Sequence, residues 1–143
     1  MFVLETHPTC LAWSVGADSA FKGLALAARV RPHPFDVTVD DLGRVTVVRV
    51  QGEVDAATAP RMGETVNRLL TRGERVVLDL QHVDFMDLHG LAVIIRATRR
   101  ARSDGGSFTI ARPAFCVRRL VELVHAEGEL RILPDGSDPL SAA

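Results

Sequence analysis

The sequence lacks a long hydrophobic run, an excess of charge of either sign and a cluster of cysteines, and each absence excludes a class of protein. No stretch approaches the roughly 20 apolar residues that a transmembrane helix needs. The formal net charge of −1 gives no general reason to expect nucleic acid as a partner. The two cysteines, Cys10 and Cys116, have no metal-type spacing and no evident reason to pair, which favours a reducing compartment.

The N-terminal segment is mildly apolar but does not have the pattern of a signal peptide. Residues 1–30 lack a basic start, and Glu5, Asp18 and Lys22 interrupt their apolar stretches. We therefore predict a cytoplasmic protein. The total of 143 residues, 47% of them hydrophobic and 24% charged, is typical of one globular domain with its own core.

Two prolines between residues 31 and 34 divide the chain, because they block a helix and favour an extended connection. We expect residues 1–34 to form an N-terminal extension that is partly disordered or, over residues 17–30, one helix. The regular pattern over residues 35–133 predicts the folded domain, and residues 134–143 form a polar C-terminal tail.

Strand-like and helix-like segments alternate along the domain. Strands are predicted over residues 35–39, 45–50, 75–80, 107–111 and 130–133, and helices over residues 59–70, 88–103 and 117–124. The order β-β-α-β-α-β-α-β implies an α/β fold with crossover helices. We expect a mostly parallel sheet of four or five strands, with helices on one or both faces.

The segment from Val76 to Arg100 carries the functional argument. A buried strand is followed by Asp87, whose carboxylate is placed to cap the next helix by accepting backbone N–H groups of its first turn. Leu88, His89 and Gly90 are then held at a helix N-terminus facing solvent. Asp55 also follows a strand, so it should meet Asp87 at the carboxyl edge of the sheet.

The helix after Asp87 has two predicted faces. The buried stripe comprises Leu88, Leu91, Ala92, Ile95 and Thr98, and the exposed line comprises His89, Val93, Arg96 and Arg100. An exposed Val93 among charges would suit a small apolar anchor in an interface. The arginines, with Arg99 and Arg102 beside them, form either a simply solvated face or a contact surface for an acidic partner.

Several short motifs in register resemble the STAS domain of bacterial anti-sigma factor antagonists. These are Gly52-Glu53-Val54-Asp55 before the first helix, Leu78-Asp79-Leu80 in the strand, Phe85-Met86-Asp87 at its end, and Gly90-Leu91 in the next helix. The resemblance covers residues 35–133. It implies a protein that binds a partner rather than an enzyme.

In typical members of that family, the turn has the sequence Asp-Ser-Ser-Gly, and its second serine is phosphorylated by an anti-sigma factor that is also a serine kinase. The unphosphorylated antagonist sequesters that kinase and so releases a sigma factor. Here Leu88 and His89 occupy the two serine positions, and no serine or threonine lies between Thr71 and Thr98. The resemblance therefore does not carry the serine switch over to this chain.

Several roles remain open for His89. It is interpreted first as a surface residue that contacts the partner, with a phosphohistidine, a pH-responsive contact and a decayed site as alternatives. A metal site is not expected, because His82 and His89 lie on different elements without a companion cysteine. Asp55 and Asp87 could suggest acid–base catalysis, but capping of turns is the favoured interpretation.

We predict a non-catalytic regulator without a cofactor, whose partner is an anti-sigma factor of the serine-kinase type. Homodimerisation stays open. The predicted contact residues are Asp55, Met86, Asp87, Leu88, His89, Gly90, Val93, Arg96 and Arg100. The alternatives are an accessory subunit of an ABC lipid transporter, a module that senses a nucleotide or a lipid, and an enzyme that relays phosphate through His89.

Overall fold

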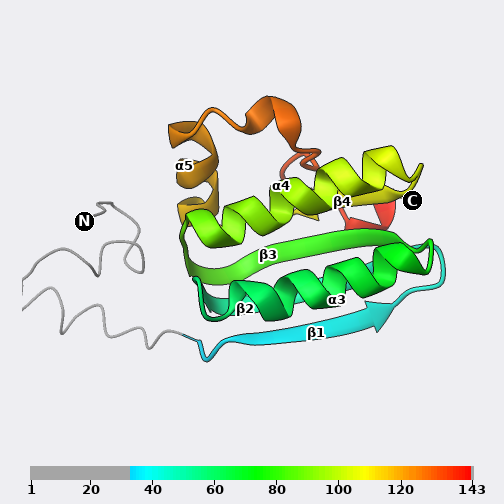
Figure 1. Ribbon diagram of the computed structural model, residues 1–143, viewed down its shortest axis with the longest axis horizontal. Helices are drawn as coiled ribbons and strands as arrows, with labels where there is room; N and C mark the ends of the chain where they lie inside the picture. The colour runs from blue at the N-terminus through cyan, green and yellow to red at the C-terminus, as the bar shows by residue number, and fades with distance from the viewer. Residues whose placement is uncertain (1–32, 143) are drawn as a thin grey trace, which may run out of the picture.

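The computed structural model describes residues 33–142, so the expected helix over residues 17–30 lies outside the described residues (Figure 1). Within the described part, no helix is both long and apolar enough to cross a bilayer. The elements are β1 (Asp36–Asp41), β2 (Thr46–Val54), α3 (Ala59–Thr71), β3 (Arg75–Met86), α4 (Leu88–Ser103), β4 (Ser107–Ala111), α5 (Phe115–Leu123), and the 3₁₀ turns η1 (Glu127–Glu129) and η2 (Pro139–Ala142).

The four strands form one mixed sheet in the order β1-β2-β3-β4. The hairpin of β1 and β2 is antiparallel, whereas β2–β3 and β3–β4 are parallel pairs connected through α3 and α4. The α/β class is therefore confirmed. The sheet is mixed rather than purely parallel, and the strand and helix order is β-β-α-β-α-β-α.

The predicted strand over residues 130–133 is wrong. Its only ladder contact among the described residues is a single bridge between Ile110 and Ile132. η1 lies directly before this segment and Pro134 directly after it, so too few residues remain for a strand. Strand β3, in contrast, extends six residues beyond the predicted end at Leu80 and reaches Met86 beside Val54 of β2.

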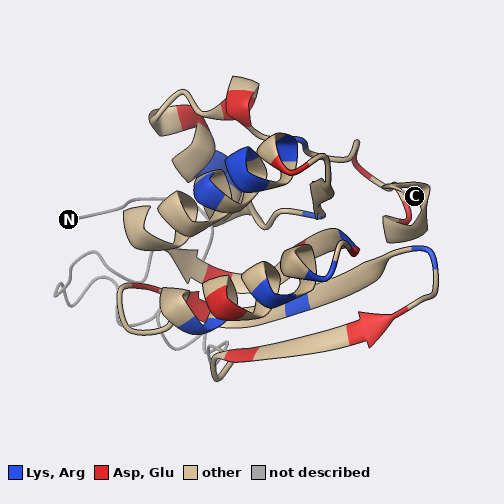
Figure 2. Ribbon diagram, turned by 45° about the vertical axis from the view of Figure 1, so that its right-hand side comes forward, with Lys and Arg blue, Asp and Glu red and all other residues tan. Residues whose placement is uncertain are grey.

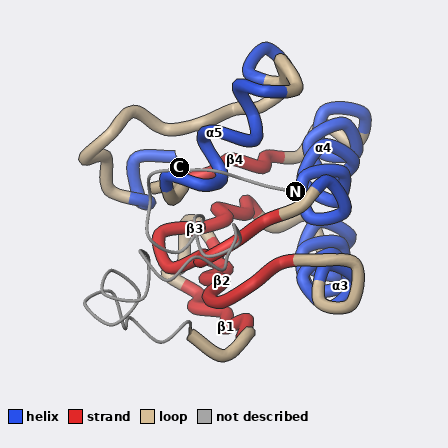
Figure 3. The backbone as a smooth tube through the Cα atoms, turned by 90° about the vertical axis from the view of Figure 1, so that its left-hand side faces the viewer, coloured by secondary structure: helices blue, strands red, loops and turns tan. Residues whose placement is uncertain are grey.

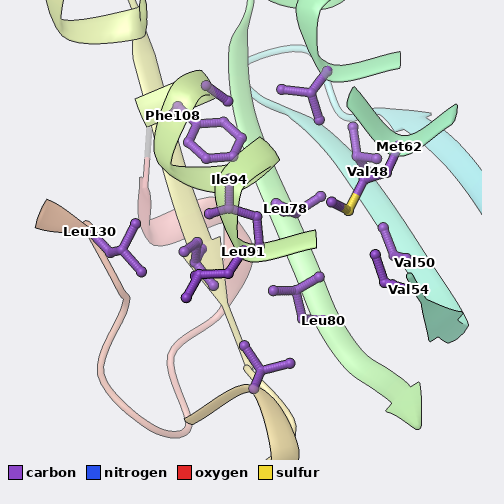
Figure 4. Packing of buried hydrophobic residues seen from close by; sticks show 14 of the residues in the cluster. Val48, Val50, Val54, Met62, Leu78, Leu80, Leu91, Ile94, Phe108 and Leu130 are labelled. Atoms are coloured by element: carbon purple, nitrogen blue, oxygen red, sulfur yellow. The ribbon is translucent and has the colours of Figure 1, made fainter. Parts of the chain in front are cut away.

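Helices α3 and α4 lie side by side over one face of the sheet (Figure 3). Their apolar stripes, with that of α5, pack on the strands in a cluster that includes Val48, Met62, Leu78, Ile94 and Phe108 (Figure 4). The other face carries a smaller cluster, in which Val45, Val47, Val77 and Ala111 meet Leu133 and Ala142. The C-terminal segment, predicted to be a polar tail, thus contributes to the packing of that face.

The end of the proline-containing connection is joined to the domain. Both the backbone N–H and the Nδ1 of His33 contact the buried Asp84 carboxylate, at 2.6 and 3.0 Å. Gly52 has φ +86°, and a Cβ there would lie 2.7 Å from the His33 carbonyl oxygen. Only glycine fits both that backbone conformation and that close approach.

Candidate functional site

The predicted cap at Asp87 is confirmed. Asp87 has an extended backbone, and its Oδ1 accepts the backbone N–H groups of His89 at 2.8 Å and of Gly90 at 3.3 Å. These bonds satisfy N–H groups that the first helical turn leaves without intrahelical partners. The start of α4 is therefore fixed by local hydrogen bonds.

His89 projects from this capped turn. Its side chain is 67% exposed, and its Nδ1 lies 3.2 Å from Oδ2 of Asp87. One carboxylate thus holds both the backbone and the ring of the same residue. The contact through Nδ1 orients the imidazole, and Nε2 is the ring nitrogen that this contact does not use.

Leu88 is 60% exposed, which corrects the expectation that it begins the buried stripe. The buried residues of α4 are Gly90, Leu91, Ile94, Ala97, Thr98 and Ala101, a set rotated from the predicted one. The sequence pattern missed Gly90 because glycine has no apolar side chain to count. Leu88 and His89 therefore both face outward at the turn.

Gly90 is buried where α4 crosses the end of β2. A Cβ at this position would lie 2.7 Å from Cγ1 of Val54 and 2.9 Å from Cγ of Met86. Glycine here lets the first turn of the helix lie directly on the strand ends. Met86 is only 4% exposed, so its predicted role as a contact residue needs correction: its side chain supports the turn from below.

Asp55 and Asp87 begin adjacent loops, as expected at this edge of the sheet. Val54 pairs with Met86 in the register of β2 and β3, and the Asp87 N–H donates to the Val54 carbonyl at 3.1 Å. The two acidic residues directly follow this pair. The loop before α3 and the loop before α4 are thereby joined into one surface.

The Asp55 carboxylate is engaged within its own turn. Burial alone would raise the pKa of Asp55, but hydrogen bonds from the N–H groups of Thr58 and Ala57 and from the Thr58 hydroxyl outweigh it, and the pKa is lowered. The Thr58 hydroxyl also donates to the Glu53 carbonyl at 2.8 Å. Sequence analysis did not identify Thr58, although its position three residues after an aspartate is typical of such turns.

The predicted exposed line of α4 is only partly exposed. Arg96 is exposed, but Val93 is half-buried against α3, where a Cβ on Gly63 would lie 3.0 Å from its Cγ1. Arg100 is half-buried, and its guanidinium donates to the Thr71 hydroxyl at 2.7 Å and to Asp104 at 3.3 Å. Val93 and Arg100 thus join α4 to α3, which corrects the expectation of an exposed anchor at Val93.

The basic run of α4 is also partly neutralised. Arg99 makes a bidentate ion pair with Glu129, and Arg102 donates to the Glu129 carbonyl at 2.9 Å. The blue segments of the ribbon in Figure 2 show that the basic residues of α4 lie in its C-terminal half. Among residues 33–142, no group of three or more histidine, cysteine or acidic side chains is arranged to hold a metal ion.

The family model described as the STAS domain matches residues 36–137. The chain belongs to the STAS domain family. This STAS domain is 27% identical over 111 residues to the anti-sigma-F factor antagonist RsfB of Mycobacterium tuberculosis, covering 77% of this chain and 90% of that protein. It is 29% identical over 92 residues to the anti-sigma F factor antagonist of Paenibacillus polymyxa, covering 63% and 76%.

Solved structures share the fold. A crystal structure of an anti-sigma factor antagonist from Mycobacterium paratuberculosis superposes with a TM-score of 0.68 at 24% identity, covering 76% of this chain and 93% of that chain. SpoIIAA in its unphosphorylated form gives a TM-score of 0.58 at 16% identity, covering 70% and 90%. The α/β architecture of this STAS domain is thus that of the solved antagonists.

Proposed function

We propose that this STAS domain is an anti-sigma factor antagonist that sequesters an anti-sigma factor of the serine-kinase type. Similarity to the antagonists from M. tuberculosis and P. polymyxa supports the regulatory role. The observation that carries the proposal is the exposed His89, placed by a capping aspartate at the helix start where the family resemblance puts the phosphorylated serine. The binding surface is the turn over residues 87–90 together with the exposed side of α4.

The usual serine switch is not part of the proposed mechanism. SpoIIAA has been solved in both an unphosphorylated and a phosphorylated form. A phosphate at this turn would add about 1.5 to 2 negative charges beside Asp87 and repel an acidic partner. Because His89 has no hydroxyl, the partner stays bound in the presence of ATP unless another input releases it.

Three outward-facing residues make different kinds of contact in the proposed complex. Leu88 offers an exposed apolar side chain, His89 offers a hydrogen-bonding ring, and Arg96 offers an exposed positive charge. A complementary partner has an apolar recess opposite Leu88 and a carboxylate within reach of Arg96. Asp55, Met86, Asp87, Gly90, Val93 and Arg100 shape and support this surface rather than supply most of its contact area.

A non-catalytic role fits the state of the two carboxylates. Asp55 accepts hydrogen bonds from Ala57 and Thr58, and Asp87 accepts them from the start of α4. Both side chains are therefore occupied in holding loops, and neither is directed alone into a cavity as a general base would be. We accordingly propose neither catalysis nor a cofactor for this site.

The test is co-purification from the native cell, followed by calorimetric titration of the retained partner. We expect an ATP-binding anti-sigma factor to be retained, and its affinity to be unaffected by ATP. His89→Asp should weaken binding at least tenfold, because it places a second carboxylate next to Asp87. His89→Ser should make the complex sensitive to ATP, because it supplies the missing hydroxyl.

The matched control is His125→Asp, the same substitution at an exposed histidine beyond the end of α5. His125 has φ +54°, a conformation that aspartate tolerates. This variant should bind like the native chain. Failure to retain any such kinase contradicts the proposal, and so does unchanged binding of a retained kinase in both His89 variants. Retention of a membrane transporter ATPase favours the accessory-subunit alternative.

A further inference from the structure

A cavity of about 140 Å³ lies between α4 and α5, away from the exposed side of the capped turn. Its walls are mostly apolar and come from α4, β4, α5 and the returning segment, residues 127–133, which follows α5 and lies beside β4. The apolar lining includes Leu91, Ile94, Ile110, Val117, Val121 and Leu130; Figure 4 labels Leu91, Ile94 and Leu130. Its volume is close to the roughly 150 Å³ of an engineered apolar cavity that binds benzene.

Hydrogen bonds and an ion pair fix the walls of this cavity relative to one another. Arg99 pairs with Glu129 at 2.7 Å, which joins α4 to the returning segment. The same segment bonds to β4 on both sides of Ile110, through Ile110 N–H to the Arg131 carbonyl at 2.8 Å and Leu133 N–H to the Ile110 carbonyl at 2.9 Å. Because these bonds fix the outer wall, the cavity cannot close simply by a shift of that segment.

The polar residues around the cavity determine which charge an occupant can carry. Glu122 and Glu127 lie in the lining with Arg118. The Arg118 guanidinium is already used, since it pairs with Asp135 and donates to the Pro113 carbonyl at 3.2 Å. Glu122 is paired as well, with Arg119 at 3.5 Å. Glu127 is therefore the lining charge without an ion pair among the described residues, and it favours an uncharged or cationic molecule over a carboxylate or a phosphate.

We propose that this cavity is a binding site for a small apolar molecule, about the size of one six-membered ring, that is uncharged or carries a positive group at the mouth. The volume sets the size, the lining sets the apolar character and Glu127 sets the charge. Fatty acids and nucleotides fall outside this class, because both carry negative charge and exceed the volume.

Such an occupant would contact the helix that carries the capped turn. Leu91 lines the cavity and lies two residues after His89 on α4. Ligand binding against Leu91 is therefore a way to regulate the capped turn without phosphorylation of a serine. This regulatory role rests on the proposed function. Ligand binding itself is tested on the chain alone, without any partner.

The experiment measures thermal unfolding of the full chain with benzene, benzylamine or benzoate. At about ten times their dissociation constants, benzene and benzylamine should raise the Tm by about 3–6 °C. Benzoate has the same ring with a negative group and should give no rise. The absence of a rise with both benzene and benzylamine overturns the site, and an equal rise with benzoate overturns the assigned charge class.

Two variants locate the effect. Val121→Phe fills part of the cavity and should abolish the response to benzene. Glu127→Gln removes the negative charge at the cavity and should let benzoate raise the Tm as benzene does. Methyl NMR of the native chain covers the case in which Val121→Phe does not fold. Benzene should shift the methyl signals of Val117 and Val121 but not those of Val47 and Val77, which pack on the opposite face of the sheet; uniform shifts overturn the proposal.

Discussion

The backbone N–H of Asp87 donates a 3.1 Å hydrogen bond to the carbonyl oxygen of Val54. This bond continues the register of β3 with β2 by one residue beyond Met86 and so ties the start of α4 to the loop before α3. The candidate surface therefore belongs to the rigid end of two parallel strands. A change that separates these strand ends should disturb the surface and the stability of the fold together.

Gly90→Ala tests how closely α4 approaches the strand ends. A Cβ would lie 2.7 Å from the Val54 side chain and 2.9 Å from that of Met86, so the buried neighbours have to move. Although alanine favours a helix over glycine, we expect a net loss of about 1–3 kcal/mol in the free energy of unfolding. Urea denaturation gives the value, and Gly106→Ala, whose nearest neighbour would lie at 3.7 Å, should change it little.

Asp55→Asn tests the turn before α3 through its pH dependence. Hydrogen bonds within the turn hold the folded-state pKa of Asp55 below its value in the unfolded chain. Its contribution to stability is therefore present above the unfolded pKa and is lost as the pH falls through the lower folded pKa. The variant should be less stable than the native chain at pH 7, and this difference should shrink toward pH 2. Urea midpoints measured across that range check it; Glu64→Gln, an exposed carboxylate on α3, should show no such convergence.

A buried carboxylate paired with a partly exposed arginine on the other face of the sheet offers a third test. Asp79 is 2% exposed, and its carboxylate bonds to the Arg112 guanidinium and to the backbone N–H of Gln81 at 3.1 Å. Arg112→Gln removes the charge that compensates this carboxylate and should destabilise the fold by about 3 kcal/mol. Arg49 lies farther away, at 3.7 Å, so Arg49→Gln should cost less.

A double-mutant cycle separates this interaction from other effects of the substitutions. Combining Asp79→Asn with Arg112→Gln should restore part of the stability lost in Arg112→Gln, because the buried carboxylate no longer lacks its main counter-charge. Simple additivity of the two losses would contradict a direct coupling between Asp79 and Arg112.

The elements with clear end signals were predictable from the sequence. The predicted bounds of α4, residues 88–103, match the structure because Asp87 caps one end and a Gly-Gly pair follows the other. The end of β3 was not predictable in this way. Polar side chains at Gln81, His82 and Asp84 hide the strand pattern, and only pairing with β2 and the contact with His33 account for those positions.

The capped turn was predicted more reliably than the direction of the side chains around it. Sequence analysis identified the turn, its cap and the neighbouring Asp55. It assigned Leu88 to the buried face, because the count of apolar side chains ignored the buried Gly90. It assigned Val93 to the exposed face, because it did not account for Gly63 of α3, which has no side chain and lets Val93 pack against that helix. Close packing at a glycine depends on the neighbouring helix or strand. The spacing of apolar residues within one helix carries no information about that neighbour.

Leu88→Ala tests the apolar part of the proposed docking surface. Since Leu88 is 60% exposed, its truncation should leave the free energy of unfolding within about 0.5 kcal/mol of the native value. If the partner buries this side chain, affinity for the anti-sigma factor should fall about tenfold, as titration calorimetry would measure. Leu123→Ala removes a comparably exposed leucine, 67% exposed, from α5 and should leave the affinity unchanged. Equal losses in the two variants would mean that recognition is not centred on the turn, whereas a loss confined to Leu88→Ala would place the turn inside the interface.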